Sequence, residues 1–252
     1  MRIVRHIGEW QSHRRGPDCT GRSVGFVPTM GALHAGHLSL LERARAENDR
    51  VVLSIFVNPV QFDNPADLER YPRTLDADLA LAGDLADCAL VPAAGEMYPD
   101  DYQFRVAERT LSSRWEGEHR PGHFDGVLTV VLKLLNLVQP DRAYFGEKDR
   151  QQLQLVQGMA AALFLPVKIV PCPTVREADG LALSSRNRLL NRAARGRAAT
   201  FPRLLRESPN PAAAVTALRR EGFEVDYVDD VGGIRLGAVR IGGVRLIDNV
   251  PL

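Results

Sequence analysis

The sequence has few of the features that mark a secreted or membrane protein. Its three cysteines, Cys19, Cys88 and Cys172, are far apart and show no paired spacing, so neither a disulfide framework nor a zinc site is expected. No apolar run is long enough to span a bilayer, and the N-terminus lacks the charged and apolar segments of a signal peptide. We therefore expect a cytoplasmic protein.

A strong charge of either sign is also missing. The 252 residues carry a formal net charge of +1, which gives no global attraction for nucleic acid or an anionic membrane. Hydrophobic residues make up 45% and charged residues 25%, as is usual for a globular protein. This length suits one large α/β domain with a small appendage. Any site for an anion must therefore be built locally.

Short apolar runs alternate with longer amphipathic segments. Runs typical of strands cover 23–27, 51–57, 89–91, 143–145 and 167–170, and helical patterns cover 38–47, 75–86, 126–137 and 149–163. Strand–helix alternation with continuous Val, Ile and Leu runs predicts a parallel sheet that is buried on both faces. We expect a Rossmann-like α/β fold with helices on both faces of the sheet. Ligands of such sheets bind at the carboxyl ends of the strands.

The character of the chain changes after Asn187. A basic, alanine-rich helical stretch leads to Ser208-Pro209-Asn210-Pro211, which is typical of a hinge or linker. A helix at 212–221, a strand at 225–228, a Gly-rich turn region and a strand at 245–247 are expected to follow. The sequence thus predicts a Rossmann-like domain over 1–187 and a small C-terminal α+β domain over 188–252. Residues 14–17 are expected to form a loop with solvated charges.

Two histidines flank a glycine directly after the first apolar run, in the string Pro28-Thr29-Met30-Gly31-Ala32-Leu33-His34-Ala35-Gly36-His37. The glycines allow tight turns and close approach of a ligand. The N–H groups at the start of the following helix favour phosphate, and imidazole can donate to phosphate oxygens. A helix-capping loop with incidental histidines is the alternative. The pair of histidines around glycine favours a phosphate site.

Polar residues also follow the second strand. Asn58-Pro59 ends that strand and places Gln61 on a loop at the edge of the sheet. One amide can bind a hydroxyl and a carboxylate together, although a single loop glutamine is not distinctive. A further string, Arg120 to Gly126, is expected to form a turn in which His123 is structural.

Two later strings are candidates for phosphate binding. Gly146-Glu147-Lys148-Asp149 joins a strand to a helix, where Lys148 supplies a point charge and Asp149 can cap the helix or hold a ribose hydroxyl. Gln152 is expected just inside that helix, facing the same pocket. In Ser184-Ser185-Arg186, two hydroxyls and a guanidinium can bind a polyphosphate. Either string alone could be an ordinary charged turn.

Taken in order, these strings resemble a known family. His34-Ala35-Gly36-His37 is similar to the His-x-Gly-His signature of nucleotidylyltransferases and class I aminoacyl-tRNA synthetases. The wider strings, over about 26–191, resemble the pantothenate synthetase family, and Val244 to Asn249 resembles the end of that family. The stretch between Tyr227 and Arg245 looks compressed for this family. We therefore expect a shortened C-terminal lid domain.

The resemblance implies an AMP-forming acid–amine ligase that condenses pantoate with β-alanine through a pantoyl-adenylate. It implies catalytic roles for His34, His37, Lys148 and Arg186, and pantoate or β-alanine binding by Gln61 and Gln152. Mg²⁺ is expected to ride on the ATP phosphates, within possible reach of Asp76 or Asp78. A homodimer is implied, without nucleic-acid or membrane partners. The implied ATP-binding residues are Met30, Gly31, Ala32, Leu33, His34, Ala35, Gly36, His37, Gly146, Glu147, Lys148, Asp149, Val175, Leu183, Ser184, Ser185 and Arg186.

Two alternatives stay open. A nucleotidylyltransferase that transfers AMP to a phosphorylated acceptor would share the histidine loop, but it would not need the Asn58 to Gln61 string or the pair Gln151-Gln152. A non-catalytic nucleotide-binding regulator would fit a shortened C-terminal region. The intact histidines, Lys148 and Arg186 argue against the regulator.

Overall fold

The structure is a computed structural model that describes residues 1–252, and the chain forms two compact units. The first unit contains residues 1–33, 37–146 and 151–172, and the second contains 34–36, 147–150 and 173–252. The division after residue 172 falls earlier than the expected boundary at 187/188. The reason is an ion pair within the second unit, in which Arg176 contacts Asp248 at 2.7 Å and so joins residues after 172 to the C-terminal strand.

The first unit is built on a six-stranded sheet with the order β1-β4-β3-β2-β5-β6, in which every pair is parallel. The five expected strands are present, so the predicted α/β class is confirmed. The additional strand lies at the edge of the sheet with two of its three residues exposed, so it shows no buried apolar run in the sequence. The strands are β1 (Arg2–Val4), β2 (Val24–Thr29), β3 (Arg50–Ile55), β4 (Cys88–Leu90), β5 (Arg142–Gly146) and β6 (Lys168–Cys172).

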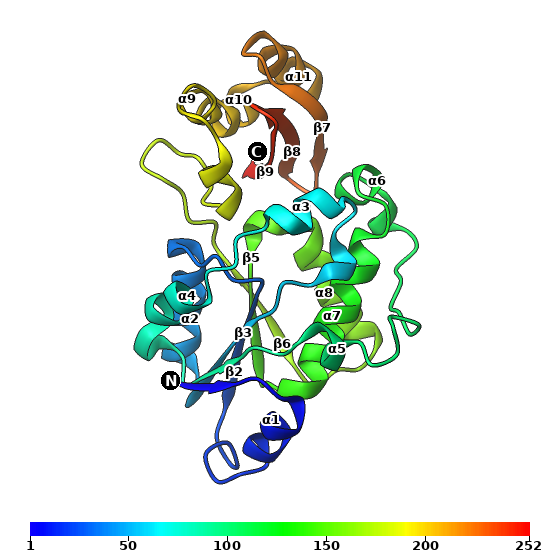
Figure 1. Cartoon of the computed structure of the whole chain (residues 1–252). Coiled ribbons are helices and arrows are strands. Elements are labelled where there is room, and N and C mark those ends of the chain that lie inside the picture. The colour runs from blue at the N-terminus through cyan, green and yellow to red at the C-terminus, as the bar shows by residue number, and fades with distance from the viewer. The chain divides into compact units, whose positions relative to one another are not determined.

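Helices cover both faces of this sheet, with α2 and α4 on one face and α7 and α8 on the other (Figure 1). The four expected helical segments correspond to α2 (Ala35–Glu47), α4 (Leu75–Ala82) with η2 (Gly83–Leu85), α7 (His123–Val138), and α8 (Arg150–Ala162) preceded by η4 (Glu147–Asp149). The remaining elements before β6 are α1 (Ile7–Arg14), η1 (Pro59–Gln61), α3 (Pro65–Arg70), α5 (Ala94–Met97), η3 (Leu111–Ser113) and α6 (Glu116–His119).

Alternate residues of the central strands point into two separate cores. Phe26 and Val52 belong to the core under α7 and α8, whereas Val27 and Leu53 belong to the core under α2. Side chains of a strand point alternately to opposite faces, so burial on both faces requires continuous apolar runs. Polar chemistry is therefore confined to the ends of the strands.

The loop that carries His34 and His37 follows β2, the strand at which the order of strands in the sheet changes direction. On one side β2 pairs with β3, and on the other it pairs with β5. Crevices at such topological switch points are the usual ligand sites of open α/β sheets. The string around Gln61 follows β3, and the string around Lys148 follows β5. The strings singled out in the sequence therefore follow three adjacent strands.

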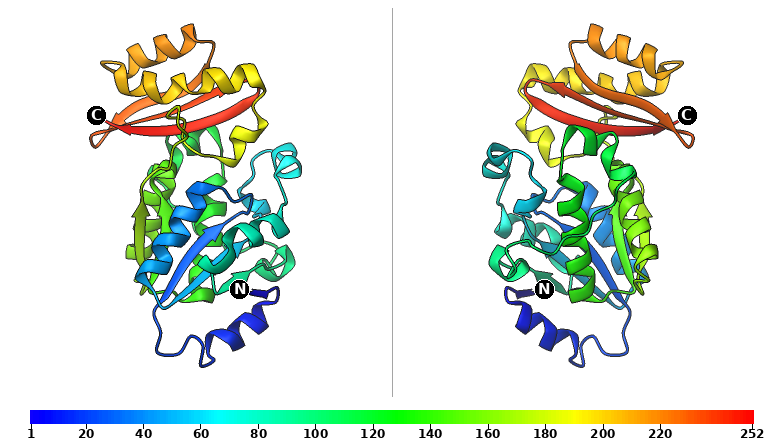
Figure 2. Two further views of the ribbon diagram at one scale, coloured as in Figure 1. Left: turned by 90° about the vertical axis from the view of Figure 1, so that its left-hand side faces the viewer. Right: turned by 90° about the vertical axis from the view of Figure 1, so that its right-hand side faces the viewer.

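The second unit contains a three-stranded antiparallel sheet, and its two longest helices lie on one face of that sheet (Figure 2). Its strands are β7 (Glu224–Val231), β8 (Ile234–Ile241) and β9 (Val244–Pro251), and its helices are η5 (Ser185–Leu189), α9 (Arg192–Ala198), α10 (Thr200–Glu207) and α11 (Pro211–Arg220). Phe201, Leu205 and Leu218 pack there against apolar side chains of β8 and β9.

The expected Gly-rich turn region contains a whole strand, β8. Gly232-Gly233 and Gly242-Gly243 form the turns on either side of it, and all four glycines have positive φ. Two-residue hairpin loops require this conformation, which glycine adopts without strain. The glycines therefore mark two hairpins, and the interpretation of this region as a turn was wrong.

The expected hinge at 208–211 is a short turn between two helices of the second unit. Arg235, which is 1% exposed, donates from Nη1 to the carbonyl oxygens of Leu205 and Ser208. The Asn210 side chain caps α11 by accepting from the Ala213 N–H at 2.9 Å. These bonds hold the turn in place, so it does not separate two domains.

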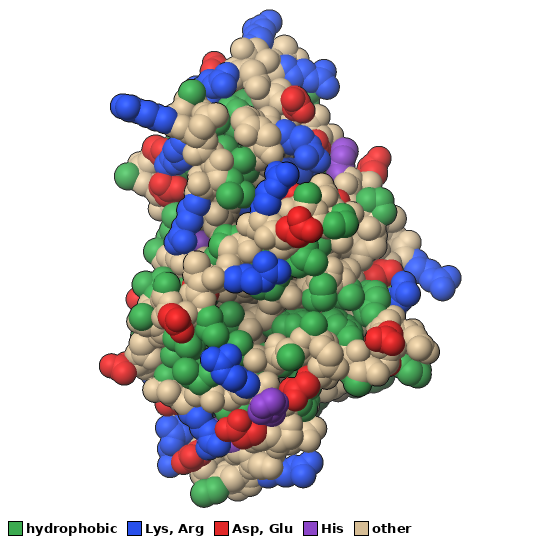
Figure 3. All heavy atoms as spheres, viewed as in Figure 1, with side chains coloured by type: hydrophobic (Ala, Val, Ile, Leu, Met, Phe, Trp, Pro, Cys, Tyr) green, Lys and Arg blue, Asp and Glu red, His purple; other side chains and the backbone are tan.

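No helix combines the length and the apolar character that crossing a membrane requires. On the face shown in Figure 3, acidic and basic side chains are interspersed. This distribution agrees with the net charge of +1. Because the charges are mixed, an anionic ligand is attracted by local contacts and not by a long-range field of the whole protein.

Candidate functional site

The loop before His34 is shaped by a buried carboxylate. Oδ2 of Asp78 accepts from the Ala32 N–H at 2.9 Å, and Oδ1 accepts from the Leu33 N–H at 2.7 Å. Gly31 and Ala32 both have positive φ, at 80° and 51°. A Cβ on Gly31 would lie 2.9 Å from Oδ2 of Asp78, so glycine is required there. Asp78 on α4 thus fixes the turn that precedes the histidines.

This arrangement alters two expectations. The N–H groups of Ala32 and Leu33 are bonded to Asp78, so these residues shape the loop and do not offer their N–H groups to phosphate. Asp78 is 3% exposed and also accepts from the Thr74 hydroxyl at 3.2 Å, so it is placed to hold the loop and not a metal ion. No group of three or more His, Cys, Asp or Glu residues is placed to hold a metal ion.

His34 is held as a neutral ring. The Gly36 N–H donates to its Nδ1 at 3.2 Å, so the neutral tautomer carries its proton on Nε2. Burial and the charges of Lys148 and Arg188 together lower the pKa of His34 to about 4, against the opposing effect of Asp149. A Cβ on Gly36 would lie 2.9 Å from Cε1 of His34, which explains the glycine between the histidines. His37 lies half-buried in the first turn of α2.

The turn that carries Lys148 is held by the last strand. Nδ2 of Asn249, on β9, donates to the carbonyl oxygens of Glu147 and Lys148, at 2.9 Å each. Nζ of Lys148 lies 3.8 Å from Oδ1 of Asp149. The Lys148 backbone is therefore fixed, while its ammonium group has one carboxylate neighbour and remains suited to an anion.

The Ser184-Ser185-Arg186 string follows a tight hairpin that the same strand holds. Arg176 makes a bidentate pair with Asp248, at 2.7 and 3.0 Å, and Leu183 donates its N–H to the Val175 carbonyl oxygen at 3.0 Å. Ser184 caps η5 by accepting from the Arg186 N–H at 3.3 Å. The guanidinium of Arg186 makes no hydrogen bond or ion pair within the protein.

The second unit thus groups several predicted phosphate ligands. It contains His34, Lys148 and the segment 184–186. Asp248 and Asn249, adjacent on β9, hold the two later strings. The first unit contains His37, Gln61 and Gln152.

Gln61 lies on η1, against helix α7. A Cβ on Gly126 of α7 would lie 2.7 Å from Cα of Gln61, so only glycine permits this approach. Nδ1 of His123 donates to the Gln61 carbonyl oxygen at 2.8 Å, and Arg120 donates to Nε2 of His123 at 3.1 Å. Burial and the Arg120 charge lower the pKa of His123 to about 4. His123 is therefore structural, as the sequence predicted.

The two adjacent glutamines of α8 differ. Gln151 is buried and donates from Nε2 to the carbonyl oxygens of Leu111 and Arg114, at 2.8 Å each. It also accepts from the Glu116 N–H at 3.1 Å, so it holds the η3–α6 segment. Gln152 is half-buried, and its side chain makes no hydrogen bond within the protein, which leaves its amide for a ligand.

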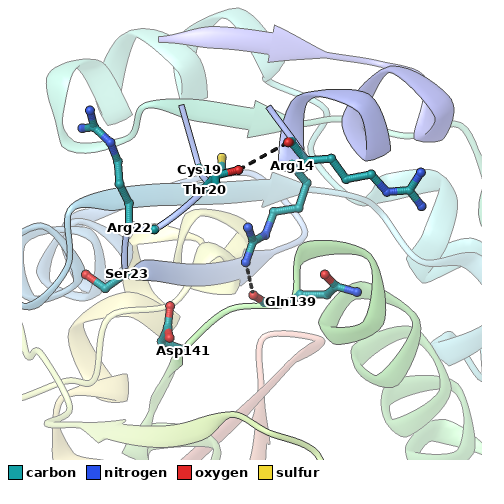
Figure 4. Close-up of a pocket in the computed structure, with 9 residues that line it drawn as sticks. Arg14, Cys19, Thr20, Arg22, Ser23, Gln139 and Asp141 are labelled. Carbon is teal, nitrogen blue, oxygen red and sulfur yellow. Dashed lines mark hydrogen bonds between the residues drawn. The ribbon is translucent and has the colours of Figure 1, made fainter. Parts of the chain in front are cut away.

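A cavity of about 660 Å³ lies at the opposite end of the sheet (Figure 4). Arg14, Cys19, Ser23 and Asp141 are among the residues that line it, ahead of the first residues of β2 and β5. Arg14 donates to the carbonyl oxygens at 138 and 139, at 2.9 Å each, and so caps α7 instead of being solvated as expected. Asp141 accepts from the N–H of residue 24 at 2.7 Å. These polar groups already serve the fold, and the cavity is not the candidate site.

The sequence reasoning missed several residues that hold the site. It considered Asp78 only as a metal ligand, and it did not single out Asp248 or Asn249 individually, although both lie in the string 244–249. Tyr98, which donates to Asn58 at 2.7 Å, carried no signal at all.

Comparisons with known proteins cover nearly the whole chain. A sequence model of the pantoate-beta-alanine ligase family matches residues 2–251. A pantothenate synthetase from Bdellovibrio bacteriovorus is 53% identical over 99% of both chains, and one from Legionella pneumophila is 49% identical over 100% of both. The C-terminal region is therefore not shortened relative to these proteins.

Solved structures agree in fold over the same length. A pantoate-beta-alanine ligase from Francisella tularensis, complexed with beta-gamma ATP and beta-alanine, has a TM-score of 0.95 at 40% identity and covers 100% of this chain and 97% of that one. A pantothenate synthetase from Thermus thermophilus has a TM-score of 0.91 at 45% identity, with coverage of 100% and 99%.

Proposed function

The chain belongs to the pantoate-beta-alanine ligase family, and from this premise we propose that it condenses pantoate with β-alanine in an ATP-dependent reaction. The products are pantothenate, AMP and pyrophosphate. The observation that carries the proposal is the match over residues 2–251, together with a relative that is 53% identical over 99% of both chains. The histidine, lysine and arginine strings of the chain supply the chemistry that such a ligase needs.

The reaction has two steps. A carboxylate is a poor acyl donor, so an oxygen of the pantoate carboxylate first attacks the α-phosphorus of ATP, and pyrophosphate leaves. The β-alanine amine then attacks the acyl carbon of the pantoyl-adenylate, and AMP leaves with the electron pair of the broken C–O bond. The protein positions the reactants and stabilises the charge that moves onto phosphate.

His34 and His37 are assigned to the phosphates during adenylate formation. The Nε2–H of a neutral His34 is a hydrogen-bond donor that does not need to be protonated first. Lys148, Ser185 and Arg186 are assigned to the β and γ phosphates and to the leaving pyrophosphate. Arg186 can bind them bidentately. Apart from Ala32 and Leu33, whose N–H groups bond to Asp78, the remaining predicted ATP ligands, including Met30, stay assigned to the nucleotide.

Gln61 and Gln152 are assigned to the oxygens of pantoate. Both lie in the first unit, and neither amide nitrogen is used within the protein. Mg²⁺ is assigned to the ATP phosphates, since it prefers phosphate oxygens and water to an all-protein cage. A cytoplasmic homodimer rests on the family resemblance alone, and light scattering after size-exclusion chromatography tests the dimer.

The function is tested with purified protein, ATP, Mg²⁺ and pantoate, with and without β-alanine. We expect AMP and pantothenate only when both substrates are present, and we expect the His37→Ala variant to lose this activity. AMP transfer to a phosphorylated acceptor would instead favour a nucleotidylyltransferase. ATP binding without any turnover would favour a regulator and contradict the proposal.

A further inference from the structure

The side-chain oxygen of Gln61 is already occupied within the protein. Nδ2 of Asn58 donates to Oε1 of Gln61 at 2.9 Å, and both residues are buried, at 1% and 8% exposure. An amide has one oxygen and one nitrogen, so this bond decides which atom of Gln61 remains for a ligand. The remaining atom is Nε2, which carries two N–H donors.

A backbone carbonyl sets the direction of this bond. Nδ2 of Asn58 also donates to the carbonyl oxygen of Gly126, at 3.2 Å. A carbonyl oxygen can only accept, so the Asn58 atom that faces it must be nitrogen. The same nitrogen faces Gln61, which must therefore present its oxygen. The orientation of both amides follows from one fixed acceptor.

Tyr98 begins a relay of hydrogen bonds that runs from its hydroxyl through the Asn58 amide to the Gln61 amide. Its hydroxyl donates to Oδ1 of Asn58 at 2.7 Å. Burial raises the pKa of Tyr98 well above its usual range, so the hydroxyl keeps its proton and remains a donor. The Tyr98 ring is held in place by Nζ of Lys133, 4.8 Å from the ring centroid, and by an edge-on contact with the Tyr102 ring.

We propose that Tyr98 is a positioning residue for the acid substrate, which acts through Asn58 to hold the Gln61 amide with Nε2 available as a hydrogen-bond donor. The inference rests on the proposed function. Nε2 of Gln61 would then donate to an oxygen of the substrate. That oxygen belongs either to the carboxylate or to a hydroxyl group, which accepts through a lone pair. Without the Tyr98 hydroxyl, Oδ1 of Asn58 loses its buried donor, and the Asn58–Gln61 pair is no longer held in one orientation.

The test is steady-state kinetics of pantothenate formation in a double-mutant cycle. Tyr98→Phe should lower kcat/KM for pantoate about 5- to 30-fold, mainly through KM, because one buried hydrogen bond of the relay is lost. The KM for ATP should stay unchanged. In a Gln61→Ala background, Tyr98→Phe should add less than about twofold, because the two residues act through one contact.

Tyr102→Phe is the matched control. It removes a hydroxyl from the adjacent ring, 5.5 Å away between centroids, and it leaves the relay intact. The pantoate kinetics of this variant should match those of the wild type. Gln61→Glu provides a second readout, because it keeps an oxygen for Asn58 and replaces the two donors with an acceptor. That variant should lose far more pantoate affinity than Tyr98→Phe. Its own loss, measured against the wild type, tests the donor role of Gln61 even if Tyr98→Phe is too unstable to assay.

The outcomes separate the inference from the function. An inactive wild-type protein overturns the proposed function, and the inference with it. An active wild type overturns the inference alone if Tyr98→Phe has no effect on pantoate, if its effect persists in full in the Gln61→Ala background, or if Gln61→Glu binds pantoate normally.

Discussion

Asp78 offers a direct test of how the loop before the histidines is built. Its two carboxylate oxygens accept from the N–H groups of Ala32 and Leu33, at 2.9 and 2.7 Å. Asp78→Asn keeps the shape of the side chain but replaces one oxygen with an NH₂ group. That group must then face an N–H donor, and no water reaches a side chain that is 3% exposed to replace the lost bond.

The magnitude follows from the bonds lost. One charge-assisted hydrogen bond disappears, the other becomes neutral, and a buried donor is left without an acceptor, so we expect a loss of about 2–4 kcal/mol in the free energy of unfolding. Because the loop leads directly into His34 and His37, its altered shape should also raise the KM for ATP. Denaturant unfolding and steady-state kinetics with ATP varied measure the two effects.

Asp76→Asn is the matched control for this prediction. Asp76 lies in the first turn of the same helix, α4, but it is exposed and its side chain makes no hydrogen bond within the protein. The control removes the same formal charge and should leave both the stability and the KM for ATP close to those of the wild type. Equal effects from the two variants, or wild-type behaviour of Asp78→Asn, would refute the structural reasoning.

Three further predictions concern other contacts. Gly126→Ala places a Cβ 2.6 Å from a carbonyl oxygen of η1; it should destabilise the protein by about 1–3 kcal/mol in denaturant unfolding and weaken pantoate binding, whereas Gly158→Ala, with open space around its Cβ, should not. Asn249→Ala removes two bonds to the turn of Lys148 and should raise the KM for ATP about tenfold with little effect on pantoate; an unchanged KM would contradict this role for β9. The pKa of His123 is lowered from an ordinary 6.5 to about 4, so the unfolded chain binds more protons between these values and stability should fall as the pH drops through this window. That loss reaches about 3 kcal/mol at most. The free energy of unfolding, measured from pH 7 to pH 4, should fall less in His123→Asn than in the wild type.

The sequence predicted the sheet and the strings of the site because both signals are local. A strand that is buried on both faces is apolar along most of its length, and the runs in β2 and β3 show this without reference to any distant residue. Glycine in the His34 to His37 loop is likewise a local requirement, since a Cβ on Gly36 would meet the ring of His34. Strand β1 was missed because two of its three residues are exposed, so it carries no local signal of this kind.

The glycine pairs of the C-terminal sheet are also a local signal, but the prediction of a single turn region from them was wrong. The pairs Gly232-Gly233 and Gly242-Gly243 are spaced to bracket one strand, and each pair adopts the positive φ of a tight hairpin. Two-residue glycine turns between apolar runs predict hairpins. The interpretation failed because the glycines were taken as one loop.

Only the tertiary structure revealed which residues hold the functional side chains. Asp78 reaches Ala32 across 46 positions of sequence, and Asn249 reaches Lys148 across 101. Neither partner is identified by spacing, because strand order and register bring these residues together. Hydrophobic periodicity selects the faces that are buried, whereas hydrogen bonds between distant polar groups depend on which chain segments those faces bring within 3 Å of each other. The sequence by itself therefore determined the fold class and the reactive strings, and the fold decided how those strings are held.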